Sequence, residues 1–360
     1  MTHYIIPIFI SHLGCPHTCV FCNQSTITAI SRDDIGLIRG KDVIKTATDY
    51  LATIPQGDRQ VELSFFGGTF TGIPVALQVE LLEAAQSLLQ AGKIQHIRCS
   101  TRPDFITPEI LERCRTFSMD IIELGVQSLD DEVLERSGRG HDARSVQQAS
   151  KLIKAYGFTL GHQIMPGLPG ATFASDLKTA DLSIAMAPDQ VRIYPTLVVR
   201  DTPLADLYAK GIYQPYDIET AVQLTGQLME RYESAGIKII RVGLQATEEI
   251  SERGSLIAGP NHPAFRELVL SKLLNDRLGQ WMAKDSVTAG AQGGDPITQQ
   301  PADFELKLNP KDISVLYADK KRYFHPNRPM IRRVVQDPAV PRGQVLVRRQ
   351  EGNLFNIICI

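Results

Sequence analysis

Three cysteines near the N-terminus form a C-x3-C-x2-C pattern on one short loop: Cys15, Cys19 and Cys22. Soft thiolate ligands select iron–sulfur clusters, zinc or copper(I). A structural zinc site or an ordinary four-iron cluster takes four protein ligands, yet the next cysteine along the chain is Cys99. Three thiolates on a four-iron cluster leave one iron open to bind a reactant. A zinc site completed by His12 or His17 is the alternative interpretation of the same loop.

The cysteine loop follows a strand-like run from Tyr4 to Ser11, and Phe21 stands directly before its last cysteine. In these respects the sequence resembles the radical S-adenosylmethionine superfamily. The resemblance implies that the three cysteines hold a [4Fe-4S] cluster. It further implies that the free iron binds the amino and carboxylate groups of S-adenosylmethionine.

A Gly-Gly-Thr turn comes directly after the second strand-like run, at Gly67, Gly68 and Thr69. Paired glycines at a strand end let a ligand approach the backbone, because no Cβ stands in the way. In the enzymes that the chain resembles, a motif of this type receives the methionine amino group of S-adenosylmethionine. A plain tight turn is the structural alternative.

The stretch from Glu123 to Asp130, continuing to His141, resembles two branches of the superfamily. One is the oxygen-independent coproporphyrinogen oxidase and haem-chaperone branch, and the other is the radical domain of the Elongator catalytic subunit. The matching family residues contact the ribose and the carboxylate of S-adenosylmethionine, which implies these roles for Gln127 and Arg139. A guanidinium suits a carboxylate, because its fork matches both oxygens.

Further contacts to the cofactor are expected at the ends of three other strands. The resemblance implies such contacts from Ser100, by position, and from Gln163, which matches a nucleoside-binding position of the family. Tyr194 is placed in the same set, near the adenine or facing the substrate. Strand parity puts His162 opposite Gln163, so we expect a core or supporting role for this histidine. The sequence identifies no catalytic residue.

Short strand-like runs alternate with amphipathic helical runs. Strands are predicted near residues 3–11, 61–66, 97–101, 120–126, 159–165 and 190–195, and helices near residues 41–54, 75–91, 107–117, 142–156, 172–186 and 217–236. Such alternation implies parallel pairing through right-handed crossovers. Six units are too few for a closed eight-fold barrel. The expected fold, which the resemblance also implies, is an α/β fold: an open (β/α)6 partial TIM barrel. Residues 238–242 are a further strand candidate at one edge.

Three of these strands carry one polar face, which is unusual for parallel strands covered on both sides. The polar faces hold Glu62, Ser64 and Phe66 on the second strand, Glu123, Gly125 and Gln127 on the fourth, and Arg192 and Tyr194 on the sixth. The polar positions recur toward the carboxyl ends of the strands, where sites form on such folds. We expect these faces to line a cup for a polar ligand. A structural hydrogen-bond network inside the barrel is the alternative.

The last part of the chain differs in charge. Between residues 307 and 349 there are eleven Lys and Arg against three acids, although the whole chain has a net charge of −2. We therefore expect a radical S-adenosylmethionine core domain over residues 1–250 and a basic α+β extension over residues 251–360, with a mobile loop near residues 285–302. Residues 320–328 interleave cations with aromatic side chains, a pattern that suits RNA. A solvated basic face is equally consistent with it.

The bulk composition predicts a cytoplasmic protein without a membrane partner. No apolar run is long enough to span a bilayer, and the N-terminus lacks the basic region and cleavage site of a signal peptide. Six cysteines in 360 residues, three of them clustered, do not indicate a disulfide framework.

The predicted function is that of a radical S-adenosylmethionine enzyme. A flavodoxin- or ferredoxin-like one-electron donor would reduce the cluster, and S-adenosylmethionine would be cleaved to methionine and a 5′-deoxyadenosyl radical. The substrate is unknown, with a tRNA nucleoside as the candidate. The short cysteine spacing and the lack of an acetyl-CoA loop argue against acetyl transfer to tRNA, and the short N-terminal segment argues against coproporphyrinogen oxidation. A non-catalytic carrier of a cluster or haem is the alternative.

Overall fold

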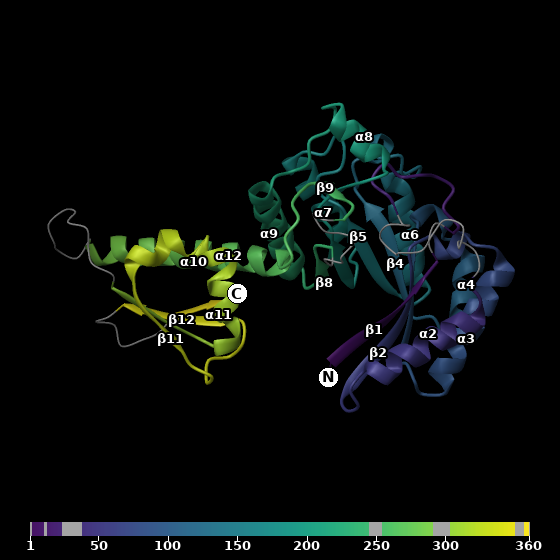
Figure 1. The fold of residues 1–360 in the computed structure, drawn as a ribbon, viewed down its shortest axis with the longest axis horizontal. Helices are drawn as coiled ribbons and strands as arrows, with labels where there is room; N and C mark the ends of the chain where they lie inside the picture. The colour runs from purple at the N-terminus through teal and green to yellow at the C-terminus, as the bar shows by residue number, and fades with distance from the viewer. Residues whose placement is uncertain are drawn as a thin grey trace. The chain divides into compact units, whose positions relative to one another are not determined.

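Seven parallel strands form the main sheet, in the order β1-β2-β3-β4-β5-β6-β8. They are β1 (Thr2–Phe9), β2 (Arg59–Phe66), β3 (His96–Thr101), β4 (Ile121–Gln127), β5 (Thr159–Ile164), β6 (Gln190–Ile193) and β8 (Lys238–Val242). In this computed structural model the sheet curls into an open half-barrel, which confirms the predicted partial TIM barrel (Figure 1). The structure describes residues 2–10, 13–23, 38–244, 254–290, 303–349 and 356–359.

Helices connect successive strands of the sheet, and most begin after a capping side chain. They are α2 (Gly40–Thr53), α3 (Val75–Gln90), α4 (Pro108–Thr116), α5 (Asp131–Arg136), α6 (Ala143–Ala155), α7 (Phe173–Ala185), α8 (Pro203–Ala209) and α9 (Ile218–Ser234). The caps that accept a hydrogen bond from the first turn are Thr107, Asp130, Asp142, Thr172, Thr202 and Asp217. Each such cap stabilises its helix by about 1 kcal/mol. The sequence did not predict α5 and α8, which are too short to show a helical period.

The two faces of the sheet differ in polarity, as the alternation of side chains predicted. On β2, Leu63 and Phe65 are fully buried on the apolar face, and the Phe65 ring stacks on Phe70 with the ring centroids 4.6 Å apart. Glu62 and Ser64, which alternate with them along the same strand, are equally buried on the opposite face. A buried polar face must satisfy its own hydrogen bonds, and these residues form part of the network described below. Two short 3-10 turns, η2 (Phe70–Gly72) and η3 (Pro103–Phe105), follow β2 and β3.

The chain divides into two compact units. Unit 1 comprises Met1–Ala221 and Gln227–Asn261, and unit 2 comprises Val222–Gly226 and His262–Ile360. Unit 1 holds the half-barrel and a small antiparallel pair, β7 (Val198–Val199) with β9 (Leu256–Ala258). No described helix is both long enough and apolar enough to cross a bilayer.

Unit 2 contains a four-stranded sheet in the order β11-β10-β12-β13 and a long helix, α10 (Phe265–Gly290). The strands are β10 (Phe304–Leu308), β11 (Ile331–Gln336), β12 (Gln344–Arg349) and β13 (Asn356–Cys359). Short helical segments lie between β10 and β11: η4 (Pro310–Asp312), α11 (Ile313–Leu316), α12 (Ala318–Lys321) and η5 (His325–Met330). Helix and sheet share one apolar core, to which α10 contributes Leu274 and Leu278 and β10 contributes Leu306. The predicted α+β character of the extension is confirmed.

The mobile loop expected near residues 285–302 begins inside a helix, because α10 runs to Gly290. The rest of that segment, residues 291–302, lies outside the described residues.

Candidate active site

A cavity of about 960 Å³ in unit 1 brings together all of the predicted site residues. Its lining includes Cys15, Cys19, Cys22, Gly67, Gly68, Thr69, Ser100, Gln127, Arg139, Gln163 and Tyr194. The strand residues among them stand at or near the carboxyl ends of β2, β3, β4, β5 and β6. This is the edge at which barrels of this type place their sites, and a cavity of this size suits a small-molecule ligand.

The cysteine loop is held in place by backbone contacts with the Gly-Gly-Thr turn. Thr69 donates its N–H to the carbonyl of Leu13 at 2.9 Å. A Cβ on Gly68 would lie 2.6 Å from the Leu13 carbonyl oxygen, and one on Gly14 would lie 2.3 Å from the Thr69 carbonyl oxygen. Side chains do not fit at these distances. Gly68 therefore lets the loop approach the turn, a role that the ligand-approach interpretation did not anticipate.

Two neighbouring side chains contact the thiols directly. The Thr69 hydroxyl lies 3.2 Å from Cys15 Sγ, and Arg139 Nη1 donates to Cys19 Sγ at 3.3 Å. Cys19 is buried, Cys15 and Cys22 are half-buried, and none of the three is in a disulfide. All three line the cavity, where thiolates are suited to hold a metal cluster.

Arg139 joins the cysteine loop to the end of β4. Its Nη2 donates to the Gly125 carbonyl at 2.6 Å, and its Nε has no hydrogen-bond partner among the described residues. A buried guanidinium donor without a partner is costly. The orphaned donor therefore fits an anionic ligand in the cavity, such as the carboxylate of S-adenosylmethionine.

Gln127 reaches the cavity because β4 ends in an irregular turn. The pairing with β5 shifts register between Gly125 and Gln127, and Gln127 adopts a left-handed φ of 65°. That conformation costs a residue with a Cβ roughly 1–2 kcal/mol. Gln163 Nε2 donates to Gln127 Oε1 at 3.2 Å, so the two amides form a pair on adjacent strands. The strained turn supports a positioning role for Gln127.

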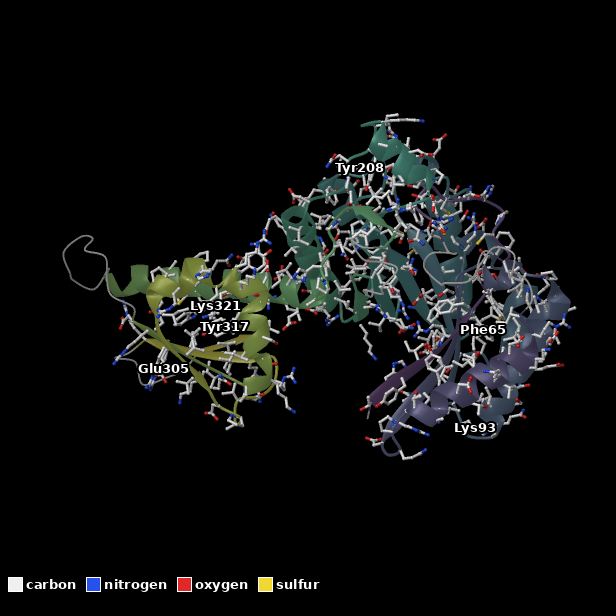
Figure 2. All side chains as sticks on the ribbon, in the orientation of Figure 1. Phe65, Lys93, Tyr208, Glu305, Tyr317 and Lys321 are labelled. Carbon is white, nitrogen blue, oxygen red and sulfur yellow. The ribbon has the colours of Figure 1, made fainter. Side chains whose placement is uncertain are left out.

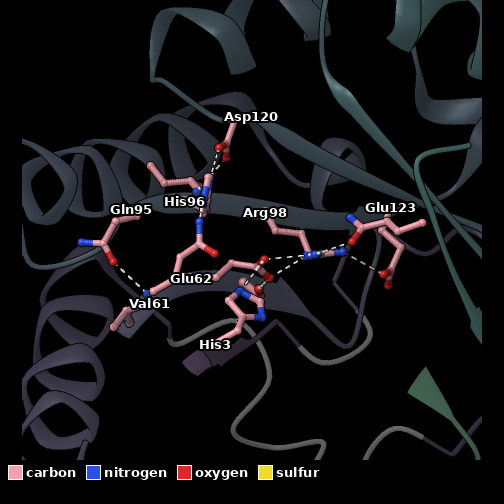
Figure 3. A network of polar contacts seen from close by, with 12 residues as sticks. His3, Val61, Glu62, Gln95, His96, Arg98, Asp120 and Glu123 are labelled. Atoms are coloured by element: carbon pink, nitrogen blue, oxygen red, sulfur yellow. Dashed lines mark hydrogen bonds and ion pairs between the residues drawn. The ribbon is translucent and has the colours of Figure 1, made fainter. Parts of the chain in front are cut away.

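The polar faces of the strands meet in a buried network of ion pairs (Figure 3). Arg98 on β3 donates through Nε to Glu62 at 2.6 Å and through Nη1 to Glu123 at 3.0 Å. Arg192 on β6 donates to Glu123 at 2.6 Å, and the Ser100 hydroxyl does so at 3.1 Å. Arg98 was not among the predicted site residues, although it shares its strand face with Ser100. The period of two along β3 was the signal that could have found it.

The electrostatics of the network keep Glu62 ionised. Burial by itself raises the pKa of Glu62, but hydrogen bonds from His3, Arg98 and Ser64 outweigh it and hold the pKa far below the ordinary value. The network thus pairs two buried carboxyl side chains, Glu62 and Glu123, with two arginines. Ser100, predicted to contact the cofactor, lines the cavity with its hydroxyl bound to Glu123.

His162 and Cys99 lie on the opposite face of the sheet from the cavity residues. His162 is fully buried between the hydroxyls of Ser150 at 2.9 Å and Ser183 at 2.8 Å, and burial lowers its pKa to about 3. Burial raises the pKa of the Cys99 thiol well above its ordinary value. The core role expected for His162 is confirmed.

The zinc alternative requires His12 or His17 as a fourth ligand. His17 is exposed, and His12 lies outside the described residues. Within the parts of the chain that the structure describes, no three His, Cys, Asp or Glu side chains are grouped so as to hold a single metal ion.

Comparisons with known proteins agree with this geometry. The family model of the Radical SAM superfamily matches residues 9–182, and that of the Radical_SAM C-terminal domain matches residues 188–275. The chain is 28% identical over 253 residues to a tRNA uridine(34) acetyltransferase of Dehalococcoides mccartyi, covering 62% of this chain and 55% of the relative. It is 27% identical over 234 residues to Elongator complex protein 3 of Homo sapiens, covering 59% and 42%. The chain thus spans about half the length of these curated relatives.

A solved structure shares the fold. The archaeal Methanocaldococcus infernus Elp3 superposes with a TM-score of 0.58 at 20% sequence identity, over 79% of this chain and 63% of that one. The two family models cover most of unit 1 and extend to residue 275. Proteins of this family use a [4Fe-4S] cluster and S-adenosylmethionine, the cofactors expected from the cysteine loop. The chain belongs to the radical S-adenosylmethionine superfamily.

Proposed function

We propose that the protein reductively cleaves S-adenosylmethionine at a [4Fe-4S] cluster held by Cys15, Cys19 and Cys22. When bound, these cofactors supply methionine and a 5′-deoxyadenosyl radical that takes a hydrogen atom from a substrate. The observation that carries the proposal is the convergence of three cysteine side chains, the Gly-Gly-Thr turn and a buried arginine on one cavity. These features are far apart in the sequence, so only the fold brings them together.

The chain's own residues then bind and orient the reactant. Gly67, Gly68 and Thr69 receive the methionine amino group, and Arg139 binds the carboxylate through its guanidinium. Ser100, Gln127 and Gln163 position the nucleoside, and Tyr194 lies near the adenine or faces the substrate.

The test is anaerobic reconstitution of the full chain with iron and sulfide, followed by dithionite and S-adenosylmethionine. We expect 5′-deoxyadenosine, measured by chromatography. The Cys22→Ala variant should lose both the cluster and the product, whereas Cys359→Ser, which changes an exposed cysteine of β13, should keep both. An intact cluster with no 5′-deoxyadenosine would instead support the non-catalytic carrier. In a cell, a flavodoxin- or ferredoxin-like donor would take the place of dithionite.

For the substrate we propose a tRNA nucleoside. Two observations support this: the relatives named above include a tRNA uridine(34) acetyltransferase, and unit 2 is basic. Much of that basic charge is already paired. Glu305 binds Arg333 and Arg348, and Asp312 binds Arg342. The cationic side chains that are exposed include Lys320, Lys321, Arg328 and Arg332.

The aromatic residues of unit 2 are less available for stacking on RNA bases than the sequence pattern predicted. Phe324 is 2% exposed and packs edge-on against Tyr317, so its ring cannot stack on a base. Lys321 covers the Tyr317 ring at 4.9 Å from the centroid (Figure 2). RNA binding by unit 2 would therefore rest on phosphate contacts more than on stacking.

Filter binding of total tRNA at several salt concentrations tests this part. The triple variant Lys320→Ala, Lys321→Ala, Arg332→Ala should bind more weakly and lower the slope of log K against log salt by about 2. Lys210→Ala, an exposed lysine of unit 1, is the control. Equal binding by both variants would contradict an RNA partner at unit 2.

A further inference from the structure

Two arginines stand side by side on the cavity face of the sheet, outside the proposed cofactor contacts. Gln163 on β5 pairs in register with Arg192 on β6, and Arg192 pairs with Arg241 on β8. Side chains in one such row share a face, on strands about 4.8 Å apart. All three residues line the cavity. The row therefore begins at a proposed nucleoside contact and ends at two guanidinium groups.

Arg192 is held rigidly before any ligand arrives. Its Nε donates to Glu123 at 2.6 Å, and Glu123 is in turn held by Arg98 at 3.0 Å and by Ser100 at 3.1 Å. The Arg192 side chain is 6% exposed. Buried ion pairs of this kind add little net stability compared with apolar residues of the same volume. A fixed guanidinium is instead what pre-organised recognition of an anion requires.

Around Arg192 and Tyr194, the hydrogen-bond donors that face the cavity outnumber the acceptors. Arg192 Nη1 donates to the Tyr194 hydroxyl at 3.2 Å, so the proton of that hydroxyl is directed to another acceptor. Arg192 Nη2 has no hydrogen-bond partner among the described residues, and its guanidinium lies over the Phe66 ring, with Cζ 5.4 Å from the centroid. Hydrogen-bond acceptors on a ligand could pair with both the Tyr194 hydroxyl and Arg192 Nη2.

The charge and polarity of the lining limit the class of ligand. The described lining residues include four arginines and one carboxylate: Arg102, Arg139, Arg192, Arg241 and Glu123. Glu123 lies against Arg192 and disfavours a dianion at the same place. The β1 residues that line the cavity are apolar: Ile5, Pro7 and Phe9. A ligand that matches these walls has one negative charge and a hydrocarbon body.

We propose that Arg192, Tyr194 and Arg241 form a subsite that binds the carboxylate of a small aliphatic acid. The subsite lies in the cavity of the proposed radical chemistry. There the acid would be a second reactant beside the tRNA nucleoside, and only that role rests on the proposed function. The fork of a guanidinium matches a carboxylate. The Tyr194 hydroxyl adds a neutral donor.

The test is binding of straight-chain acids from acetate to hexanoate to the reconstituted protein with S-adenosylmethionine present, measured by saturation-transfer NMR. The matching uncharged amides and inorganic phosphate are the comparison ligands. We expect at least one acid to bind in preference to its amide and to phosphate. Arg192→Met and Arg241→Gln should each weaken this binding about tenfold, the loss expected for one charge-assisted hydrogen bond. Lys238→Gln, which removes an exposed charge at the start of β8, should change it less than twofold.

Equal binding of acid and amide, preference for phosphate, or unchanged binding in both arginine variants would overturn the subsite. Arg192→Met leaves Glu123 paired with Arg98, so the fold should persist. If the Arg192→Met variant loses its cluster, the binding measured with Arg241→Gln decides whether the subsite exists, because Arg241 is only half-buried. The measurement needs no turnover, so absence of 5′-deoxyadenosine would contradict the proposed function and leave the subsite standing.

Discussion

The two units of this protein use burial in opposite ways. In unit 1 the inner face of the half-barrel buries four ionisable side chains, Glu62, Arg98, Glu123 and Arg192, which are at most 6% exposed. In unit 2 the sheet buries an apolar core, and its ion pairs, such as Arg333 with Glu305, involve exposed partners.

The difference indicates where chemistry takes place. Burying charges is expensive, and apolar residues of similar volume often give equal or greater stability. A polar interior is therefore best explained by a ligand that it must bind and orient. The apolar core of unit 2 stabilises a scaffold, so any partner of unit 2 meets its surface. Four experiments test this contrast between the polar interior of unit 1 and the apolar core of unit 2.

The largest expected effect comes from the cysteine loop. Cys19→Ala should reduce the formation of 5′-deoxyadenosine to background, because a cluster with two thiolate ligands is not held. Iron content and the visible absorption of the cluster are the measurements. Cys114→Ser, a buried cysteine on α4 away from the cavity lining, is the control and should keep the cluster. A cluster retained by the Cys19→Ala variant would contradict the assignment of the metal site.

The second effect is on stability. Arg98→Met removes the guanidinium shared by Glu62 and Glu123 and leaves Glu62 buried without its main partner. Loss of one partner from a buried pair costs about 3–5 kcal/mol. Urea unfolding of unit 1, followed by circular dichroism, measures the change. A cost below about 1 kcal/mol would mean that the inner face is more hydrated than its burial indicates.

The third effect depends on pH and concerns a carboxyl outside the cavity. Asp176 on α7 accepts hydrogen bonds from the Gly167 N–H and the Tyr216 hydroxyl, both at 3.0 Å. Burial nevertheless raises its pKa to about 7 from 3.8. The folded state then keeps a proton that the unfolded chain releases, so the free energy of unfolding falls as pH rises from about 4 to about 7.

The size of this decline is at most about 4 kcal/mol, from a shift of about three pKa units. Thermal unfolding of the wild type and of Asp176→Asn at pH 5 and pH 8 measures it. The asparagine variant should lose the part of the pH dependence that belongs to this group. Identical pH profiles for the two proteins would show that Asp176 ionises normally.

The smallest effect is expected in unit 2. Arg333→Met removes one partner of Glu305, but Arg348 still donates to this carboxylate at 3.0 Å. The arginine side chain is 59% exposed, and surface pairs contribute less than about 1 kcal/mol. Urea unfolding of this variant beside Arg98→Met compares the two units directly. If both variants lost the same free energy of unfolding, the two units would not differ in how they use buried charge.

The sequence predicted the elements of the half-barrel closely, because strong signals specify them. Alternating apolar residues mark β2 and β4, and capping residues such as Asp142 and Thr172 mark the starts of helices. The cavity residues were found through motifs and family resemblance. Arg98 was missed because its one local signal is weak: it shares a face of a short strand with Ser100. Its meaning comes from Glu62 and Glu123, which lie on two other strands.

The sequence by itself determined the parallel half-barrel, the cluster of three cysteines on one loop and the basic character of the last part of the chain, since periodicity, spacing and charge are local properties. Only the tertiary structure decided that Gly68 makes room for the cysteine loop, that Phe324 is buried, and that Arg192 and Arg241 meet on the wall of one cavity. These facts depend on distances between segments that are far apart in the chain. Such distances are set by strand register and packing, which no local pattern records.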